Sequence, residues 1–316
     1  MSIIEKAAEK AAGKLGQAEK NAKAPALSII ERAARKAEKE DIANIVQAKT
    51  LTEPDRKSGI AESETDPSPL HGATPQSNLA TIDLARLRQL GGVTPNEEKT
   101  QIAEEFRLIK RPLITNAFNQ GAGKINNGNL IMVTSALAGE GKTFCAINLA
   151  MSIAMEMDHT VLLVDADVAR PSIPKYLGLK AGRGLLDVLL DDRIELADVM
   201  MRTNVEKLSI LTAGKKSVHA TELLASQSMS DLLTDIAQRY PDRIVIFDSP
   251  PLLLTTEAQV LATQMGQIVM VVEAETTPQQ TVVEALRQIE SCDVINLIYN
   301  KARAFSGGGY YGYNYD

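Results

Sequence analysis

The sequence has no tryptophan and few other aromatic residues, with five phenylalanines and seven tyrosines among 316 residues. No aromatic side chain occurs before Phe106. Aromatic side chains supply much of the buried area of a typical core, so we do not expect residues 1–105 to form a second globular domain. A chain of this length is therefore interpreted as one folded domain with an appendage.

Cysteine is also scarce, because the chain contains only Cys145 and Cys292. Neither lies in a C-x-x-C or Cys/His spacing, which excludes a disulfide scaffold and gives no support for a zinc site or an iron–sulfur cluster. This spacing disfavours a reductase of the iron-protein type. Two reduced thiols in a cytosolic protein are the expected state.

Long hydrophobic runs are missing, and so is any excess of positive charge. No stretch of about 18 apolar residues occurs, so the sequence predicts no transmembrane helix. The start, MSIIEKAAEKAAGK, lacks the apolar core of a signal peptide, and we expect a cytoplasmic protein. The formal net charge of −6 argues against nucleic acid as a partner.

The first 80 residues are predicted to contain helices and a linker. SIIEKAAEKA at 2–11 recurs as SIIERAARKA at 28–37, and each copy begins with an S-x-x-E capping box, so residues 1–50 are expected to be helical. One interpretation is that these helices bind a partner or an anionic membrane surface. The other is a solvated appendage, and the alanine-rich apolar stripe favours this second interpretation. Residues 51–80 are rich in proline and polar residues and are predicted to be a flexible linker.

From residue 129 onward, short apolar runs alternate with helical patterns. Strands are predicted at 129–135, 160–166, 208–213, 243–249, 267–274 and 294–300, and helices at 143–156, 220–239 and 278–291. A further helix is predicted from 102 up to Pro112. Strands that are apolar on both faces indicate a doubly wound, mostly parallel α/β sheet with helices on both faces. We expect this domain to span 81–303, followed by a tail at 304–316.

A phosphate-binding loop is the sharpest motif in the sequence. Residues 136–143, ALAGEGKT, fit G-x-x-x-x-G-K-[ST] with Ala136 in place of the first glycine, between a predicted strand and a predicted helix. In such a loop backbone N–H groups cradle phosphates, while Lys142 reaches the β- and γ-phosphates and Thr143 binds Mg²⁺. The expected nucleotide-binding residues are Ala138, Gly139, Glu140, Gly141, Lys142, Thr143 and Phe144.

Acidic residues follow two of the predicted strands. Asp165 and Asp167 come after VLLV, and Asp248 ends the run IVIFD. Ligands of open α/β sheets bind at the carboxyl ends of the strands, so these acids are expected to lie beside the phosphate-binding loop. One of them can serve Mg²⁺ while another accepts a proton from an attacking hydroxyl.

Together the motifs GEGKT, VLLVDAD-x-x-RP and IVIFDSPP resemble those of the bacterial tyrosine kinases of polysaccharide synthesis. These enzymes resemble P-loop ATPases of the MinD/ParA type and phosphorylate protein tyrosine. The resemblance covers about residues 102–316. The SIIEKA start and the EEFRLIKRPL segment look closest to soluble autokinases associated with exosortase-type exopolysaccharide loci.

The resemblance implies ATP and Mg²⁺ as cofactors and assigns roles to individual residues. It implies catalytic roles for Lys142, Asp165, Asp167 and Arg170, and Mg²⁺ binding by Thr143, Asp167 and Asp248. Asp165 is taken as the base and Asp167 as a support for the metal and Thr143. The usual motif is D-x-D-x-R, whereas this chain has Ala169 in the fifth position and Arg170 one residue later.

A second implied surface is an oligomer interface. Glu104, Arg107 and Lys110 match the family pattern E-x-x-R-x-x-R, with lysine in the last place, and their spacing puts them near one helical face. In the family this face packs subunits into a ring. The alternative is a local Glu–Arg pair that contributes a few tenths of a kcal/mol.

The C-terminal segment 304–316, AFSGGGYYGYNYD, resembles the tyrosine cluster that these kinases phosphorylate on one another. The implied phosphorylation sites are Tyr310, Tyr311, Tyr313 and Tyr315. The family also implies homo-oligomers, a membrane activator similar to a chain-length determinant, a cognate tyrosine phosphatase, and a peripheral position at the inner face of the plasma membrane. The alternative for the segment itself is a sticky tail without a substrate role.

Two other functions remain open from the sequence. A spatial ATPase of the MinD/ParA type carries a signature lysine early in the P-loop, where this chain has Leu137. A nucleotide-gated scaffold without kinase activity would bind a membrane chain-length protein, and the alanine at position 169 is consistent with it.

Overall fold

A computed structural model describes residues 79–95, 100–121, 123–240 and 242–302. The predicted helical segment 1–50, all but the last two residues of the predicted linker 51–80, and the tail tyrosines lie outside the described residues. Among the described helices, none combines the length and the hydrophobicity that a bilayer span requires.

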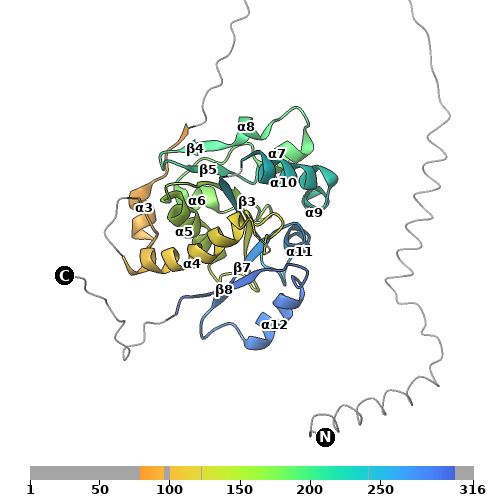
Figure 1. Ribbon diagram of the computed structural model, residues 1–316. Coiled ribbons are helices and arrows are strands. Elements are labelled where there is room, and N and C mark those ends of the chain that lie inside the picture. The colour runs from red at the N-terminus through yellow and green to blue at the C-terminus, as the bar shows by residue number, and fades with distance from the viewer. Residues whose placement is uncertain (1–78, 96–99, 122, 241, 303–316) are drawn as a thin grey trace, which may run out of the picture. The chain divides into compact units, whose positions relative to one another are not determined.

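The centre of the described chain is an eight-stranded sheet in the order β1-β4-β5-β3-β6-β2-β7-β8 (Figure 1). Its strands are β1 (Leu79–Ala80), β2 (Leu130–Ser135), β3 (Thr160–Asp165), β4 (Met201–Thr203), β5 (Leu208–Leu211), β6 (Arg243–Asp248), β7 (Gln267–Glu273) and β8 (Ile295–Asn300). Only the β4–β5 pair among these strands is antiparallel. The predicted doubly wound, mostly parallel sheet is confirmed.

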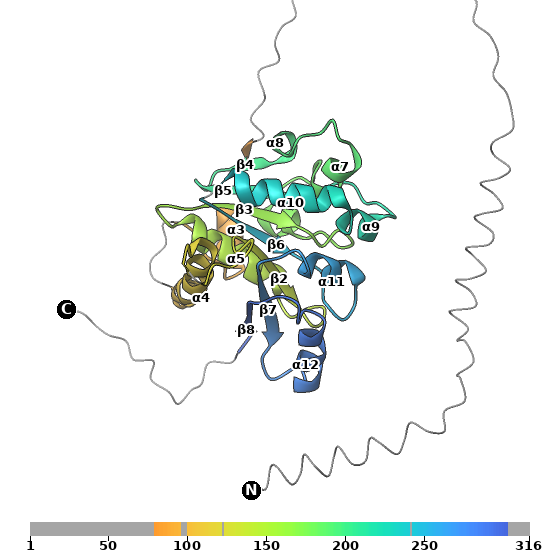
Figure 2. The same ribbon diagram turned by 45° about the vertical axis from the view of Figure 1, so that its right-hand side comes forward.

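Helices cover both faces of the sheet, as both Figure 1 and Figure 2 show. One face carries α3 (Leu84–Gln89), α4 (Gln101–Phe118), α5 (Lys142–Ala154) and α6 (Ile173–Leu177). The other carries α7 (Leu185–Leu190), α8 (Leu196–Val199), α9 (Ala220–Leu224), α10 (Gln227–Arg239), α11 (Thr256–Ala262) and α12 (Gln279–Arg287).

The central strands read as continuous apolar runs because both of their faces are buried. In β3, Leu162 and Val164 pack into the core under α7 to α12, while Val161 and Leu163 pack into the core under α3 to α6. All four side chains are at most 1% exposed. Because both faces are buried, the core fixes the position of each strand end. The position of the residue that follows each strand is therefore fixed as well.

Three details differ from the sequence-based expectation. The predicted helix 220–239 is two helices, because Ser226 interrupts it and caps α10 by accepting a hydrogen bond from Met229 N (3.2 Å). β4 was not predicted, and β1 extends the sheet into the last two residues of the expected linker, since Leu79 and Ala80 pair with β4. Strands of two and three residues are too short to show a hydrophobic period.

Helix α4 also continues beyond the predicted stop at Pro112 and ends at Phe118. A proline inside a helix removes one backbone hydrogen bond and costs about 3 kcal/mol. The helix continues because the residues that follow the proline are anchored in the core. Leu113 is 1% exposed, and the buried Gln267 side chain donates to Leu113 O (3.0 Å) and accepts from Asn116 Nδ2 (3.0 Å).

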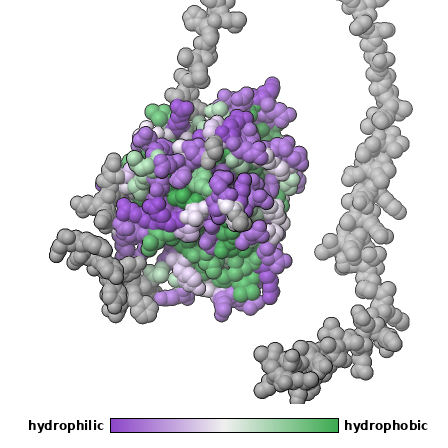
Figure 3. Space-filling view, in the orientation of Figure 1, coloured by the Kyte–Doolittle hydropathy of each residue, from purple (hydrophilic) through white to green (hydrophobic). Residues whose placement is uncertain are grey.

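Strand β8 lies at one end of the sheet order and carries exposed apolar side chains. Leu297 is 47% exposed and Tyr299 is 71% exposed. In the space-filling view much of the visible surface is hydrophilic, and hydrophobic residues gather where Figure 1 places β7, β8 and α12 (Figure 3). The carboxyl end of this strand leads directly to the C-terminal segment.

Lys110 does not share the exposed face of α4 that the E-x-x-R-x-x-K spacing suggested. Its side chain is 3% exposed and lies between α4 and α5, where Nζ donates to Ser152 O (2.5 Å) and pairs with Glu156 (2.7 Å). Burial lowers the pKa of Lys110, and the Glu156 carboxylate opposes this effect. Glu104 and Arg107 form an exposed pair at 2.5 Å. Lys110 thus holds the subunit together internally, and this correction leaves Glu104 and Arg107 as the exposed residues of the pattern.

We predict that Lys110→Ala lowers the free energy of unfolding by about 2–4 kcal/mol, because it removes a buried ion pair and leaves Ser152 O and Glu156 without this donor. Arg107→Ala, at an exposed pair on the same helix, should change it by no more than about 0.5 kcal/mol. Urea unfolding followed by circular dichroism measures both variants. Equal effects of the two substitutions would contradict the internal role of Lys110.

Candidate functional site

The loop that joins β2 to α5 has the backbone of a phosphate cradle. Gly139 and Gly141 adopt φ angles of 90° and 97°, in the left-handed region that favours glycine. Gly141 is the N-cap of α5. The N–H groups of the first helical turn have no partner inside the helix, so they are available to a ligand at this loop. A Cβ atom at Gly141 would collide with the side-chain amide of Asn300. The left-handed backbone therefore favours glycine at position 141, and a side chain there would also displace the Asn300 amide.

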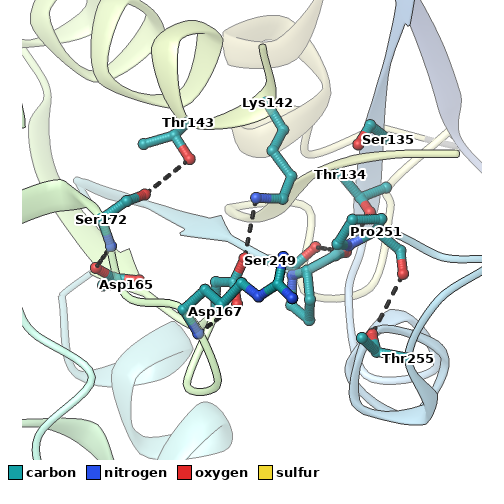
Figure 4. A network of polar contacts seen from close by, with 12 residues as sticks. Thr134, Ser135, Lys142, Thr143, Asp165, Asp167, Ser172, Ser249, Pro251 and Thr255 are labelled. Atoms are coloured by element: carbon teal, nitrogen blue, oxygen red, sulfur yellow. Dashed lines mark hydrogen bonds and ion pairs between the residues drawn. The ribbon is translucent and has the colours of Figure 1, made fainter. Parts of the chain in front are cut away.

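Lys142 begins α5 and reaches across the site to Asp167. Its Nζ lies 3.0 Å from Asp167 Oδ2, and the two side chains are 15% and 7% exposed (Figure 4). The other oxygen of Asp167 accepts a hydrogen bond from Arg170 N (3.0 Å). The predicted phosphate-binding lysine and the second acid of the D-x-D motif are therefore direct partners.

Ser172 connects Thr143 to Asp165, as Figure 4 shows. Its hydroxyl lies 3.1 Å from Thr143 Oγ1, and its backbone N–H donates to Asp165 Oδ2 (2.9 Å). Ile173 N donates to the same carboxylate oxygen (3.0 Å). The first acid of the motif thus fixes the turn that brings the Ser172 hydroxyl to the predicted magnesium ligand.

Asp248 ends β6 as a fully buried acid. It is 0% exposed, and both of its carboxylate oxygens lack a hydrogen-bond partner among the described residues. Burial raises the pKa of Asp248 to about 7, and the positive charge of Lys142 opposes the shift. Burial likewise raises the pKa of Asp165 to about 6. One oxygen of Asp165 is also buried without a partner.

These unpartnered oxygens fit a site for a divalent cation with a phosphate. Within the described ranges, no group of three or more His, Cys, Asp or Glu side chains is arranged to hold a metal ion on its own. Mg²⁺ usually takes one or two carboxylates and completes its shell with water and substrate phosphates. Thr143, Asp167 and Asp248 match that requirement when a phosphate lies in the adjacent loop.

A cavity of about 490 Å³ opens beside this group of side chains. Its lining includes Ala138, Gly139, Gly141, Lys142, Thr143, Phe144, Asp167 and Arg170 among the residues predicted from the sequence. Tyr176 and Leu254, together with Pro250 and Pro251 of the IVIFDSPP motif, form apolar walls, and none of the four was predicted as a site residue. The volume falls in the range of small-ligand sites.

The two aspartates of the D-x-D motif differ in access. Asp167 lines the cavity, whereas Asp165 is 0% exposed and lies behind the Ser172–Ile173 turn. Arg170 is exposed and also lines the cavity, although it comes one residue later than the usual arginine. The structure therefore brings both acids and the arginine to one edge of the sheet but presents only Asp167 and Arg170 to the cavity.

Glu140 was expected to bind nucleotide, but its side chain turns away from the cavity. It is 2% exposed, accepts a hydrogen bond from Leu137 N (2.6 Å) and contacts the Thr277 hydroxyl. Its backbone carbonyl accepts from Asn300 Nδ2 (2.8 Å). Glu140 thus secures the loop from behind, and only its backbone N–H is available for phosphate.

Sequence reasoning missed Asn300 and Lys301, which contact the loop from the end of β8. Lys301 Nζ donates to Gly139 O (2.9 Å) and pairs with Glu273 (3.0 Å). The available signal was their position at the carboxyl end of a predicted strand, the edge where the other site residues lie.

Comparisons with known proteins agree with this geometry. Residues 126–299 match the ParA family model, described as NUBPL iron-transfer P-loop NTPase. The tyrosine-protein kinase YwqD of Bacillus subtilis (strain 168) is 31% identical over 224 residues, which cover 70% of this chain and 90% of that protein. EpsB of Ralstonia nicotianae, named a putative tyrosine-protein kinase, is 29% identical over 73% of this chain, which spans only 31% of EpsB.

A solved structure supports the same fold. The kinase domain of the Escherichia coli tyrosine kinase ETK superposes with a TM-score of 0.54 at 23% identity. The match covers 73% of this chain and 94% of that domain.

We predict that Asp248→Asn raises the free energy of unfolding at pH 8, without Mg²⁺ or nucleotide, by about 1–3 kcal/mol, because it removes a buried unpaired charge. The folded-state pKa is raised, so the penalty grows from the unfolded value of 3.8 up to about pH 7 and is complete above it. The advantage of the variant should therefore shrink at pH 5.5. Urea titrations in EDTA at the two pH values measure it, and a variant less stable than wild type at pH 8 would contradict the prediction.

Proposed function

The chain belongs to the bacterial tyrosine-protein kinases, which use a ParA-like P-loop NTPase domain, and from this premise we propose that it transfers phosphate from ATP to tyrosines of its own C-terminal segment. The observation that carries the proposal is the meeting of Lys142, Thr143 and Asp167 at one cavity beside the phosphate loop. Asp248, with its two unpartnered oxygens, lies behind them.

Bound Mg·ATP supplies the phosphoryl group and the positive charge that stabilises its transfer. The N–H groups of residues 139–143 hold the phosphates at the start of α5. Thr143 and Asp248 take the metal side of the site, with Asp167 as a further support. Ser172 holds the Thr143 hydroxyl in place through the contact at 3.1 Å.

Lys142 has to change partners when nucleotide enters. In the described structure its Nζ is bound to Asp167 at 3.0 Å. A phosphate held by the loop would carry more negative charge than one carboxylate, so Lys142 would pair with it and leave Asp167, which lines the cavity, without this partner. Loading the site therefore also prepares one of the acids.

A carboxylate of the D-x-D pair accepts the proton of the attacking tyrosine. Tyrosine has a pKa of about 10, so the transfer occurs late and mainly needs a well-placed acceptor. Asp165 keeps the assignment of base, and its raised pKa of about 6 supports that role. Because Asp165 lies behind the Ser172–Ile173 turn, the role requires this turn to shift, whereas Asp167 already faces the cavity.

The proposed acceptors are Tyr310, Tyr311, Tyr313 and Tyr315. They are four of the seven tyrosines of the chain, and Gly307 to Gly309 precede them, so a neighbouring subunit is a natural donor of this segment. Glu104 and Arg107 on α4 are the residues we propose for subunit contact. A membrane activator, a phosphatase and a role in exopolysaccharide synthesis complete the proposal and rest on the family resemblance.

We predict that Lys142→Met lowers phosphotyrosine in the 304–316 segment by at least about 100-fold, because the charge that stabilises the transferring group is lost. Lys175→Met removes an exposed lysine of α6 and serves as the matched control, with phosphorylation near wild type. Mass spectrometry after incubation with Mg·ATP measures both. If the wild-type chain hydrolyses ATP but forms no phosphotyrosine, the result would support a spatial ATPase. If it binds nucleotide but neither hydrolyses ATP nor forms phosphotyrosine, the result would support a scaffold.

The two acids can be separated by comparing Asp165→Asn with Asp167→Asn. If Asp165 is the base, its asparagine variant loses about 100-fold or more in transfer rate while nucleotide affinity changes little. Asp167→Asn should weaken Mg²⁺-dependent nucleotide binding more strongly than Asp165→Asn. Single-turnover transfer rates and nucleotide titrations give the two quantities, and the opposite pattern would assign the base to Asp167.

A further inference from the structure

The end of β8 is hydrogen-bonded to the phosphate loop through two side chains. Asn300, the last residue of the strand, donates from Nδ2 to Glu140 O at 2.8 Å. Lys301, the next residue, donates from Nζ to Gly139 O at 2.9 Å. Two consecutive carbonyls of the loop are therefore held by two consecutive residues of the same strand end.

Residues at the end of β7 add further contacts to Lys301, Asn300 and the loop. Glu273 accepts the Lys301 ammonium at 3.0 Å, and Ala274 N donates to Asn300 O at 2.9 Å. The Thr277 hydroxyl, a few residues later, contacts the buried carboxylate of Glu140. The loop thus rests on the carboxyl ends of β7 and β8 along the side opposite to the cavity.

Holding these carbonyls also aims the N–H groups that follow them. A trans peptide is planar, and its C=O and N–H point in opposite directions. The contact of Lys301 with Gly139 O therefore orients the N–H of Glu140, and the contact of Asn300 with Glu140 O orients the N–H of Gly141. Both N–H groups belong to the part of the loop that a phosphate would occupy.

The backbone at Lys301 indicates that this contact is built in. Its φ is 58°, in the left-handed region that a residue with a side chain adopts at a cost of about 1 kcal/mol or more. The conformation turns the chain at the end of the strand and lets the ammonium group reach both Gly139 O and Glu273. The segment 304–316 begins three residues further on.

We propose that Asn300 and Lys301 are positioning residues of the nucleotide site, and that through them nucleotide binding at the loop and the conformation of the β8 end are coupled. The proposal rests on the proposed function only for the identity of the nucleotide. A bound phosphate and the β8 contacts both require the same orientation of the loop peptides, so each favours the other. Coupling of this kind is reciprocal in binding free energy.

The chain offers a closely matched control in Lys207. Its φ is 69°, and its Nζ donates to Glu156 O and Met157 O, each at 2.9 Å. Lys207 precedes β5 and therefore lies at the amino ends of the strands, away from the phosphate loop. Lys301→Met and Lys207→Met each remove one lysine with a left-handed backbone and two acceptors, and they differ in which edge of the sheet they affect.

The first measurement is the affinity of the full chain for MgADP by isothermal titration calorimetry. We expect Lys301→Met to weaken binding by about threefold to tenfold, as for a charged hydrogen bond that is partly open to solvent. Lys207→Met should bind within about twofold of wild type, and Lys301→Arg should recover most of the loss, because its guanidinium can donate to Gly139 O. Thermal unfolding without nucleotide checks that both methionine variants are folded.

The second measurement is amide hydrogen exchange across residues 295–301. MgADP should slow exchange there in wild type and in Lys207→Met, and the slowing should be reduced in Lys301→Met when each is compared at nucleotide saturation. Unchanged affinity in Lys301→Met, equal losses in the two methionine variants, or equal slowing in all three proteins would each overturn the proposal. Neither measurement needs phosphate transfer, so a chain that binds MgADP without kinase activity would refute the proposed function and leave this inference standing.

Discussion

The site is governed by an excess of buried negative charge. Asp165, Asp167 and Asp248 meet at the carboxyl ends of β3 and β6, and Lys142 is the cation that reaches them. Lys142 pairs with Asp167, and Asp165 is satisfied in part by two backbone N–H groups. Among the described residues Asp248 accepts no hydrogen bond within ordinary distance, although the charge of Lys142 acts on it. A cation alone would relieve the acids but leave the phosphate loop empty, while a phosphate alone would add to the repulsion. The arrangement therefore favours a cation and a phosphate together.

Such a site requires a loop that does not move when the charges around it change. β2 is held between β6 and β7, and its side chains are buried on both faces, so the start of the loop is fixed by the core. The middle of the loop is fixed from behind by Glu140, Asn300 and Lys301. This support leaves the opposite side of the loop free for ligand. Lys142 can then exchange Asp167 for a phosphate without a change in the backbone that carries it.

The parts of this structure that could be predicted are those in which local sequence and burial agree. Strands β2, β3 and β6 read as apolar runs because the sheet is covered on both faces, and the glycines of the loop mark backbone angles that other residues rarely adopt. The continuation of α4 past Pro112 could not be predicted, since it depends on Gln267, more than 150 residues away. Lys110 looked like a surface residue for the same reason, because its partners are Ser152 on α5 and Glu156 just after that helix. Asn300 and Lys301 belong to none of these motifs, and their position at the carboxyl end of a predicted strand does not by itself show that this end lies beside the loop, which depends on the strand order.

The strand order also gives a physical reason for the position of the tyrosine-rich segment. β8 lies beside β7, and β7 lies beside the strand that leads into the phosphate loop, so the last strand of the domain ends next to the first phosphate-binding residues. Strand β8 therefore ends beside the nucleotide site of its own chain. The chain that continues from β8 passes first through Lys301, whose ammonium group donates to Gly139 O in the loop. The contacts of Asn300 and Lys301 with the loop therefore follow from the strand order, which brings the end of β8 to the loop that joins β2 to α5.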